Sequence, residues 1–547
     1  QGDLTGEGTV DLDDFVILKN NFGTAAAVDV MIDDVLGAGP LMAITEINYH
    51  PYDPSPAELA AGFTDANLFE FIELTNIGAS SFNVAGCEFT KGIDYVFPSK
   101  VLAPGQRIII VANLAAFRAR YGAAIPVLGT FTGALSSSGE QILLRNSAGL
   151  TMVNFVYEDG GDWPGRPDGK GSTLEVIDPR GDYNDPDNWR PSAEWHGTPG
   201  SAGAGEVVDV VVNEVLAHTD EPAVDAIELH NTTGAAIDIS GWYLSDDSDD
   251  YLKYRIPAGT VIPAGGYVVF YATQFGSAFG LSATGDDVWV LAADATGKLT
   301  RFVDHVEFLA SHNSESLGRY PNATGRLYPM LNVTLGAANS EPRVGPLILT
   351  EVLYAPTTPT AAHLEFVEIH NPTGLPVDLT NWALDKDVEY VFPAGTILPA
   401  GGTLVVTSFD PALAANATLL NTFRTTYGID ASVAMVGGWI GQLPDADGHV
   451  QLLRPDEPDP ADPTVIPYFL EDEVRYDSAA PWPAASGLSL QRVAADLWGN
   501  DSASWAAEGP TPGTFGGEAP KPGDINLDGA VDLDDFVILK QNFGAAG

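Results

Sequence analysis

A pattern of short apolar segments and turn residues occurs three times in the interior of the chain, and this repetition restricts the fold more than any other feature. The two clearest copies are residues 226–270 and 366–406. Each starts with Glu-apolar-His-Asn, continues through a Gly-Trp or Asn-Trp pair and ends in an apolar run containing Pro-Ala-Gly. The first copy, residues 71–110, is more divergent and has Cys87 at the tryptophan position. Three copies of one pattern predict three copies of one structural unit.

Runs of β-branched and aromatic residues alternate with turns rich in Gly, Pro and Asn, which is typical of antiparallel strands in a sandwich. Helical periodicity is nearly absent outside the chain ends and short stretches such as residues 114–121. We therefore predict a mostly β protein with three tandem immunoglobulin-like β-sandwiches. Clusters of small, polar and proline residues mark the predicted linkers. The predicted sandwiches are residues 41–200, 207–338 and 346–515, the linkers are 24–40, 201–206, 339–345 and 516–522, and the remaining ends are 1–23 and 523–547.

The three repeats resemble lamin tail domains, an immunoglobulin-like sandwich found in nuclear lamins and in many bacterial secreted proteins. The matching pattern is Asn/Thr-Glu-apolar, then Glu-apolar-x-Asn, then Gly-Trp-x-Leu, then an apolar run around Pro-x-Gly. Bacterial members typically close with Trp-Pro, a Gly-x-Ser-Leu-Glu-like strand and Gly-Thr-Pro-Gly. The resemblance implies the fold and, as a function, only an adhesive or spacer module.

The closing pattern is present in two of the three repeats. The first repeat has it at residues 163–164, 171–175 and 197–200, and the third at 482–483, 487–490 and 511–513. The second has only residues 314–319, without Trp-Pro and without Thr-Pro-Gly. By this pattern the second repeat is the most divergent.

The two ends of the chain are near copies of one acidic loop followed by an apolar segment. From Val10 to Gly23 and from Val531 to Gly544, the copies differ only at Asn20 and Gln541. Each loop has oxygen-bearing side chains at positions 1, 3, 5, 9 and 12 and glycine at position 6, a spacing that suits Ca²⁺ with a carbonyl ligand at position 7. The predicted ligands of two calcium sites are Asp3, Thr5, Glu7, Thr9, Asp11 and Asp14, and Asp524, Asn526, Asp528, Ala530, Asp532 and Asp535. One such loop is compatible with a solvated acidic turn, but two with the same offset to an apolar helix favour calcium.

The segment after each loop is apolar around nearly a whole helical turn, so it has more than one face to bury. A loop and one short helix are too small to form a core alone. We therefore predict that the two ends pair with each other. The predicted contact residues are Phe15, Val16, Leu18 and Phe22 at one end and Phe536, Val537, Leu539 and Phe543 at the other.

These loop–helix halves, which are EF-hand-like, resemble the repeats of type I dockerins. In that family two repeats lie close in sequence, pack as one module and dock onto a cohesin domain. Here the whole interior separates them. Loop positions 10 and 11, which often bear hydroxyls in cohesin-binding dockerins, are Leu12-Asp13 and Leu533-Asp534. Both departures count against ordinary cohesin docking.

The charge of the chain excludes some partners. With 74 acidic and 25 basic residues, the net charge is −49, which excludes nucleic acid and anionic membranes as partners. One cysteine excludes internal disulfides, and no apolar run is long enough to insert into a bilayer. Because millimolar extracellular calcium suits the loops, we expect a secreted or cell-surface protein whose leader has been removed.

The residues that could carry chemistry favour no enzyme. Glu46, Glu214 and Glu351, and likewise Glu73, Glu228 and Glu368, recur once per repeat, and we expect them to accept backbone N–H bonds, with an extra metal role as the alternative. Cys87 is predicted to be a core residue. His230 and His370 share a register position that Thr75 occupies in the first repeat, which argues against catalysis. Asp445 and Asp447 resemble the start of a calcium loop but lack a position-12 acid, so a turn is expected.

The separation of the two half repeats leads to the main functional hypothesis. Each predicted sandwich is roughly 40 Å across, so three in an extended row would hold the ends on the order of 100 Å apart. Pairing the tail of one molecule with the head of the next then needs no bend and generates an open filament. The alternatives are a monomer whose ends pair internally and dock to a cohesin-like receptor, and a module that binds a surface or polysaccharide, such as a cell-surface glycan, through exposed aromatics such as Trp439 or Tyr251.

Overall fold

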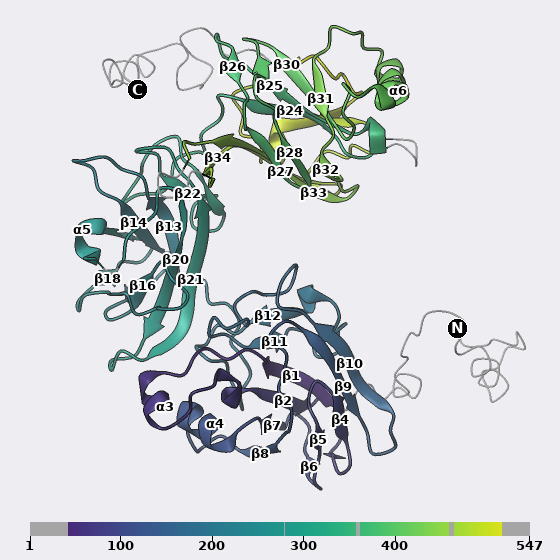
Figure 1. Ribbon diagram of the computed structural model, residues 1–547. Helices are drawn as coiled ribbons and strands as arrows, with labels where there is room; N and C mark the ends of the chain where they lie inside the picture. Colours follow the sequence, from purple (N-terminus) through teal and green to yellow (C-terminus); the bar gives the residue numbers. More distant parts are fainter. Residues whose placement is uncertain (1–41, 278, 357–361, 459–463, 517–547) are drawn as a thin grey trace, which may run out of the picture. The chain divides into compact units, whose positions relative to one another are not determined.

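The computed structural model describes residues 42–516 apart from 278, 357–361 and 459–463 (Figure 1). The described residues form two compact units. The first contains the residues up to 207 together with 293–303, and the second contains 208–292 and the residues from 304 onward. Strands dominate both units and the helices are few and short. The protein is therefore mostly β, while the predicted count of three domains stays a prediction.

The first unit is a sandwich of two sheets. The six-stranded sheet has the order β12-β11-β1-β2-β7-β8, the four-stranded sheet has the order β10-β9-β4-β5, and β3 pairs with β6. All pairs are antiparallel except β7 with β8. The elements are β1 (Met42–Asn48), α3 (Pro56–Ala60), β2 (Phe71–Asn76), β3 (Phe82–Asn83), β4 (Glu88–Lys91), β5 (Tyr95–Val96), β6 (Val101–Leu102), β7 (Arg107–Val111), α4 (Leu114–Tyr121), β8 (Val127–Thr130), β9 (Glu140–Arg145), β10 (Thr151–Tyr157), β11 (Leu174–Val176) and β12 (Trp189–Pro191). One core joins the sheets, with Ile72 and Ile110 on one side and Ile142 and Phe155 on the other.

The second unit begins with a five-stranded sheet of order β19-β14-β13-β22-β23 and a four-stranded sheet of order β17-β16-β20-β21, with β15 paired to β18. Its elements are β13 (Val210–Leu216), β14 (Ala226–Asn231), β15 (Ile237–Asp238), β16 (Tyr243–Ser245), β17 (Tyr254–Arg255), β18 (Val261–Ile262), β19 (Tyr267–Tyr271), α5 (Ala272–Phe275), β20 (Gly285–Ala293), β21 (Leu299–Leu309), β22 (Leu317–Tyr320) and β23 (Arg326–Pro329). The last residue of β20 and residues 299–303 of β21 are grouped with the first unit.

The same unit continues with sheets of order β31-β30-β25-β24-β35-β36 and β32-β28-β27-β33-β34, with β26 paired to β29. Its elements are β24 (Ile348–Leu353), β25 (Phe366–His370), β26 (Val377–Asp378), β27 (Ala383–Lys386), β28 (Val388–Val391), β29 (Ile397–Leu398), β30 (Thr403–Thr407), α6 (Ala417–Tyr427), β31 (Met435–Gly437), β32 (Ile440–Gly441), β33 (Asp447–Pro455), β34 (Tyr468–Asp477), β35 (Ser489–Arg492) and β36 (Trp505–Glu508). Short 3₁₀ helices lie at residues 66–69, 186–188, 362–364, 414–416 and 502–504.

The central strands β2 and β25 are buried on both faces. Because side chains alternate along a strand, Val367 and Ile369 enter the core between the sheets, while Phe366 and Glu368 lie on the opposite face. That outer face is covered by α6 in the last third of the described chain, where Phe423 packs on Phe366. α4 covers the equivalent face of the first unit.

The helix α6 differs from the expectation that helical periodicity is nearly absent in the interior. Its apolar residues Leu419, Leu420, Phe423 and Tyr427 recur at three- and four-residue intervals and pack against the sheet. The shorter helix α4 coincides with the stretch 114–121 that the sequence indicates. The longer helix was missed because Asn and Thr residues interrupt its apolar positions.

Candidate functional site

Paired glutamates on two neighbouring strands form the most regular polar arrangement in the described residues. Glu46 lies directly opposite Glu73, Glu214 opposite Glu228, and Glu351 opposite Glu368. Each pair lies on the sheet face turned away from the core between the sheets, and every member is at most 1% exposed. Buried carboxyl groups require hydrogen-bond donors, and other parts of each repeat supply them.

The chain segment that closes each repeat supplies backbone donors. Oε1 of Glu46 accepts the N–H of Thr198 at 2.7 Å, Glu214 accepts that of Thr334 at 2.8 Å, and Glu351 accepts that of Thr511 at 2.9 Å. Two residues further on, a glycine N–H bonds the second glutamate. These bonds join Gly200 to Glu73 at 2.7 Å, Gly336 to Glu228, and Gly513 to Glu368 at 2.6 Å. We call each glutamate pair with its bound turn a glutamate clasp.

Side chains complete the clasp in the same way in each copy. A bulge interrupts the strand just before the first glutamate, between Ile44 and Glu46, Val212 and Glu214, and Leu349 and Glu351. The residue in the bulge then donates to the second glutamate: Thr45 to Glu73 at 2.7 Å, Asn213 to Glu228 at 2.9 Å, and Thr350 to Glu368 at 2.8 Å.

A hydroxyl group from another segment donates to the first glutamate. The donors are Thr173 to Glu46 at 2.7 Å, Ser316 to Glu214 at 2.5 Å and Ser489 to Glu351 at 2.5 Å. A bulge re-aims a side chain that a regular strand would point to the other face. The bulge therefore explains how two adjacent residues of one strand, the bulge residue and the first glutamate, can both serve the clasp.

The glycine of the closing turn is required by its backbone conformation. Gly200, Gly336 and Gly513 have φ of +92°, +92° and +95°, a region that other residues rarely adopt. A Cβ on Gly513 would lie 2.6 Å from Cγ1 of Val433. The second position of the turn is free to vary, because Pro199, Leu335 and Pro512 occupy it.

Burial raises the pKa of most of these carboxyl groups. The pKa of Glu228 and that of Glu368 rise to about 7 because burial disfavours the charged form, and the neighbouring Glu214 and Glu351 add to the rise. Burial, followed by the charge of Glu73, raises the pKa of Glu46 well above its usual range. Oε2 of Glu46 is buried without a hydrogen-bond partner, which fits a protonated acid group.

The clasp is suited to holding a chain segment rather than to acid–base chemistry. Apart from Oε2 of Glu46, its carboxyl oxygens accept bonds from N–H and O–H donors of the same chain, which confirms the expected role as acceptors of backbone bonds. The described residues contain no group of three or more His, Cys, Asp or Glu side chains placed to hold a metal ion. The arrangement fastens the end of each repeat to its first two strands.

The second clasp shows what the sequence pattern missed. Residues 334–336, Thr-Leu-Gly, replace Thr-Pro-Gly and make the same contacts as in the other repeats. The second repeat does lack Thr-Pro-Gly, but the turn is present all the same, because the bonds use backbone N–H groups and do not require proline. A search for Thr-x-Gly, with any residue between, would have found this turn.

The predicted calcium ligands and the predicted contact residues of the two ends fall outside the described residues. They are Asp3, Thr5, Glu7, Thr9, Asp11, Asp14, Phe15, Val16, Leu18 and Phe22, and Asp524, Asn526, Asp528, Ala530, Asp532, Asp535, Phe536, Val537, Leu539 and Phe543. Both sites stay predictions.

Cys87 and His230, two residues that the sequence analysis considered for chemistry, pack against other side chains. Cys87 is 1% exposed in the core of the first unit, with Sγ 3.9 Å from Sδ of Met152, as its register with the buried Trp242 and Trp382 predicts. His230 stacks on the ring of Tyr267, with 4.3 Å between the ring centroids, and burial lowers its pKa.

Two aromatic residues proposed for polysaccharide binding are not available for it. Trp439 is 6% exposed and Tyr251 is 1% exposed, so the expectation that they form an exposed binding surface was wrong. Trp439 belongs to the core of the second unit, and Tyr251 packs on Trp289. Both follow acidic or glycine-rich turns in sequence, and such neighbours conceal that the ring itself turns inward.

Comparisons with known proteins identify part of the chain. Residues 204–308 and 340–454 match the family model of the Lamin Tail Domain. No curated protein matches. A crystal structure of a DUF4876 family protein from Bacteroides thetaiotaomicron aligns with a TM-score of 0.21 and 12% identity, covering 55% of this chain and 92% of the other. In the described part of the chain, every helix is too short or too polar to cross a membrane. Two segments of this mostly β chain are thus similar to lamin tail domains, which have an immunoglobulin-like fold.

Proposed function

We propose that this is a secreted structural protein that assembles head to tail, through calcium-dependent pairing of the C-terminal loop–helix half of one molecule with the N-terminal half of the next. The observation that carries the proposal is the near identity of the two halves, which differ at one position between Val10–Gly23 and Val531–Gly544. Each half is too small to bury its apolar residues alone. Ca²⁺ would order each loop, and the folding of the joint would depend on that binding.

The interior of the chain supports a structural role. We infer that residues 42–200 form a third lamin tail domain, since they share the glutamate clasp with the two matched segments although they lie outside both. The described chain begins in the first unit at residue 42 and ends in the second at residue 516. The two halves are therefore connected to different units. The proposal includes no catalytic step.

Mass measurement with and without calcium tests the assembly. In millimolar CaCl₂, sedimentation velocity of the full chain should show a ladder of species that grows with protein concentration, and excess chelator should return it to monomer. MgCl₂ at equal concentration controls for general screening of the charge of −49. Monomers that persist in calcium at high protein concentration, or long species that persist in chelator, would count against the proposal.

A mixing experiment separates pairing between molecules from pairing within one. The head variant Asp3→Ala/Asp14→Ala keeps a working tail, and the tail variant Asp524→Ala/Asp535→Ala keeps a working head. Each alone should stay monomeric in calcium, and an equimolar mixture should stop at the dimer because only one competent joint exists per pair. If the halves of one molecule pair internally, the mixture still forms a dimer, because each variant has one free working half, but wild-type protein run beside it stays a compact monomer at every concentration.

A matched control removes two acidic groups elsewhere. Asp445 and Asp447 are exposed. Asp445 lies in the turn before β33 and Asp447 is the first residue of that strand, so no helix follows them. Asp445→Ala/Asp447→Ala should therefore assemble as wild type does. Loss of assembly in this variant would show that total charge, and not the terminal loops, controls association. A cohesin-like receptor remains the competing partner, and it would bind a monomer with internally paired ends.

A further inference from the structure

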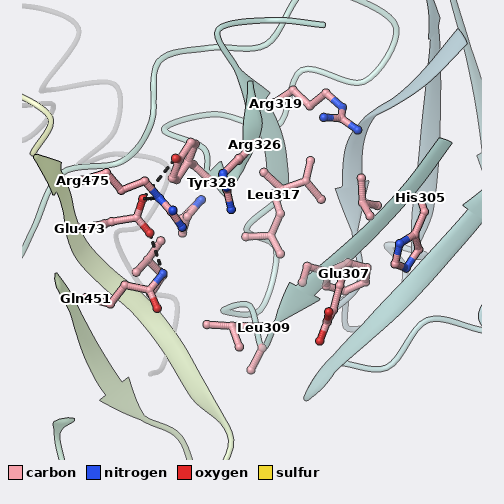
Figure 2. Close-up of a pocket in the computed structure, with 16 residues that line it drawn as sticks. His305, Glu307, Leu309, Leu317, Arg319, Arg326, Tyr328, Gln451, Glu473 and Arg475 are labelled. Carbon is pink, nitrogen blue, oxygen red and sulfur yellow. Dashed lines mark hydrogen bonds and ion pairs between the residues drawn. The ribbon is translucent and has the colours of Figure 1, made fainter. Parts of the chain in front are cut away.

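A cavity of about 290 Å³ lies in the second unit, where the hairpin β22–β23 approaches the strand β34. Figure 2 shows Tyr328, Glu473, Arg475 and Gln451 gathered on one side of it, with His305 and Glu307 on the other. The volume is close to the lower limit of about 300 Å³ for small-molecule pockets. It suits a ligand the size of one ring rather than a large cofactor.

Glu473 anchors the polar side of this cavity. Its Oε1 accepts bonds from the hydroxyl of Tyr328 at 3.2 Å, from Nε of Arg475 at 2.9 Å and from Nδ2 of Asn500 at 3.0 Å. Its Oε2 accepts a bond from Nε2 of Gln451 at 2.6 Å and contacts the ring nitrogen of His449 at 3.0 Å. One carboxylate thus orients the surrounding side chains before any ligand arrives.

The charge state of Glu473 fixes the orientation of the Gln451 amide. Burial alone would raise the pKa of Glu473, but the hydrogen bond from His449, the charge of Arg475 and the bond from Gln451 together lower it to about 2. An ionised carboxylate only accepts hydrogen bonds, so Gln451 must present its NH₂ group to Glu473. Its carbonyl oxygen Oε1 is then directed elsewhere.

The carbonyl oxygen of Gln451 is the unsatisfied group of the site. Gln451 is 7% exposed and its Oε1 is buried without a hydrogen-bond partner among the described residues. A buried acceptor without a donor costs about 1–3 kcal/mol. A ligand that brings a hydroxyl or N–H group to this oxygen would recover that loss.

Other groups of the lining provide free donors and acceptors. Arg326 and Glu307 are exposed, and no hydrogen bond or ion pair of the described residues engages either side chain. Arg475 uses Nε for Glu473, which leaves its two Nη groups for a ligand. The cavity therefore offers guanidinium donors together with amide and carboxylate acceptors, beside apolar surface from Leu309 and Pro329.

We propose that this cavity is a carbohydrate-binding site that takes one sugar ring of a glycan. A sugar hydroxyl both donates and accepts, so adjacent hydroxyls can serve Gln451 Oε1 and an arginine at the same time, while the ring's C–H face covers Leu309 and Pro329. A fully deprotonated anion such as sulfate or chloride brings no donor for Gln451, a cation is repelled by Arg326 and Arg475, and an apolar ligand would leave all of these groups unpaired.

Binding is tested on the full chain in chelator, so that the result does not depend on calcium-dependent assembly. Affinity gel electrophoresis with three embedded polymers, a neutral glucan, a polyuronate and an N-acetylhexosamine polymer, should retard the protein in at least one. Saturation-transfer NMR with the matching free monosaccharide then distinguishes recognition of one ring from recognition of the polymer alone. Retardation by none of the three polymers overturns the proposal.

The variants Arg326→Ala and Glu307→Ala remove side chains without partners, so both should fold as wild type does. Each should weaken retardation on the order of tenfold, the effect of losing one hydrogen bond to a charged group. Gln451→Leu should abolish it, with circular dichroism confirming the fold. The matched control is Arg118→Ala, an exposed arginine of α4 in the other unit. If Arg118→Ala weakens retardation as much as Arg326→Ala, or if neither Arg326→Ala nor Gln451→Leu changes it, the cavity is not the site.

Discussion

Glu368 accepts the backbone N–H of Gly513 at 2.6 Å, although 145 residues separate them in the chain. The equivalent bonds span 127 residues between Glu73 and Gly200 and 108 residues between Glu228 and Gly336. Each bond joins the second strand of a repeat to its last turn. The clasp therefore fastens the last turn of each repeat to its second strand. Loss of the clasp should lower the free energy of unfolding.

Replacing the clasp glycine tests this directly. Gly513→Ala places a Cβ at a φ of +95° and 2.6 Å from Cγ1 of Val433, so the free energy of unfolding of the second unit should fall by about 1–3 kcal/mol. Urea unfolding followed by tryptophan fluorescence measures the loss. Gly509→Ala is the control, since a Cβ there meets no atom within 4 Å. A Gly513→Ala variant as stable as the control would contradict the role of the turn.

The clasp should also make stability depend on pH. Burial raises the pKa of Glu228 and of Glu368 to about 7, so the folded state holds these protons more tightly than the unfolded chain does. Their stabilising contribution is complete below the ordinary glutamate pKa and is lost as pH rises through about 7. From about pH 8 to pH 5, the second unit should gain about 2 kcal/mol per carboxyl group.

Thermal unfolding of glutamine variants across this pH range shows which carboxyl groups cause the pH dependence of stability. Glu228→Gln/Glu368→Gln should flatten the pH dependence of the second unit. Glu341→Gln/Glu389→Gln removes the same charge from exposed positions and should leave the slope unchanged. Equal flattening in both variants would mean that the total acidic charge, and not the clasp, sets the slope.

The single cysteine should report on the opening of the first unit. Cys87 is 1% exposed and burial raises the pKa of its thiol, so both access and thiolate formation are suppressed in the folded state. Ellman's reagent should react slowly in native buffer and rapidly once denaturant unfolds the first unit. Complete reaction within the mixing time under native conditions would place the thiol at the surface.

Removal of calcium should affect assembly through the chain ends but not the stability of the two units. The described residues are held by apolar cores and by hydrogen bonds such as those of the clasps. We therefore expect a chelator to abolish assembly while leaving the thermal transitions of both units unchanged, as measured by calorimetry. A large fall in either transition would indicate a metal site within the units.

Part of the fold and of the site follows from local sequence. Alternating apolar residues, as in Val153, Phe155 and Tyr157 of β10, predict strands because side chains alternate between faces. The recurrence of a glutamate on each of two early strands predicts that both have one role in every repeat. The shared register of Cys87 with Trp242 and Trp382 predicts its burial. Each of these signals can be recognised in a short stretch of sequence, compared where necessary with the matching stretch of another repeat.

Other features depend on contacts that no local pattern contains. The sequence alone shows neither that Trp439 and Tyr251 turn inward nor that Gln451 and Tyr328 bond the same carboxylate. Residues 334–336 were overlooked because their backbone, and not their side chains, makes the bonds to Glu214 and Glu228. Backbone donors have the same chemistry at every non-proline residue, so their partners are decided by the path of the chain.

The sequence by itself determined the β class of the interior, its repetition and the presence of a similar acidic loop at each end, because strand alternation and loop spacing are short-range properties. Only the tertiary structure decided which turn each glutamate pair holds and how β34 and the β22–β23 hairpin enclose a polar cavity. Those contacts join residues more than 100 positions apart, such as Glu368 with Gly513 and Tyr328 with Glu473. They form only when the sheets have packed. Burial makes an unpaired polar group unfavourable, so each buried polar group is found bonded to a partner that the packing brings close.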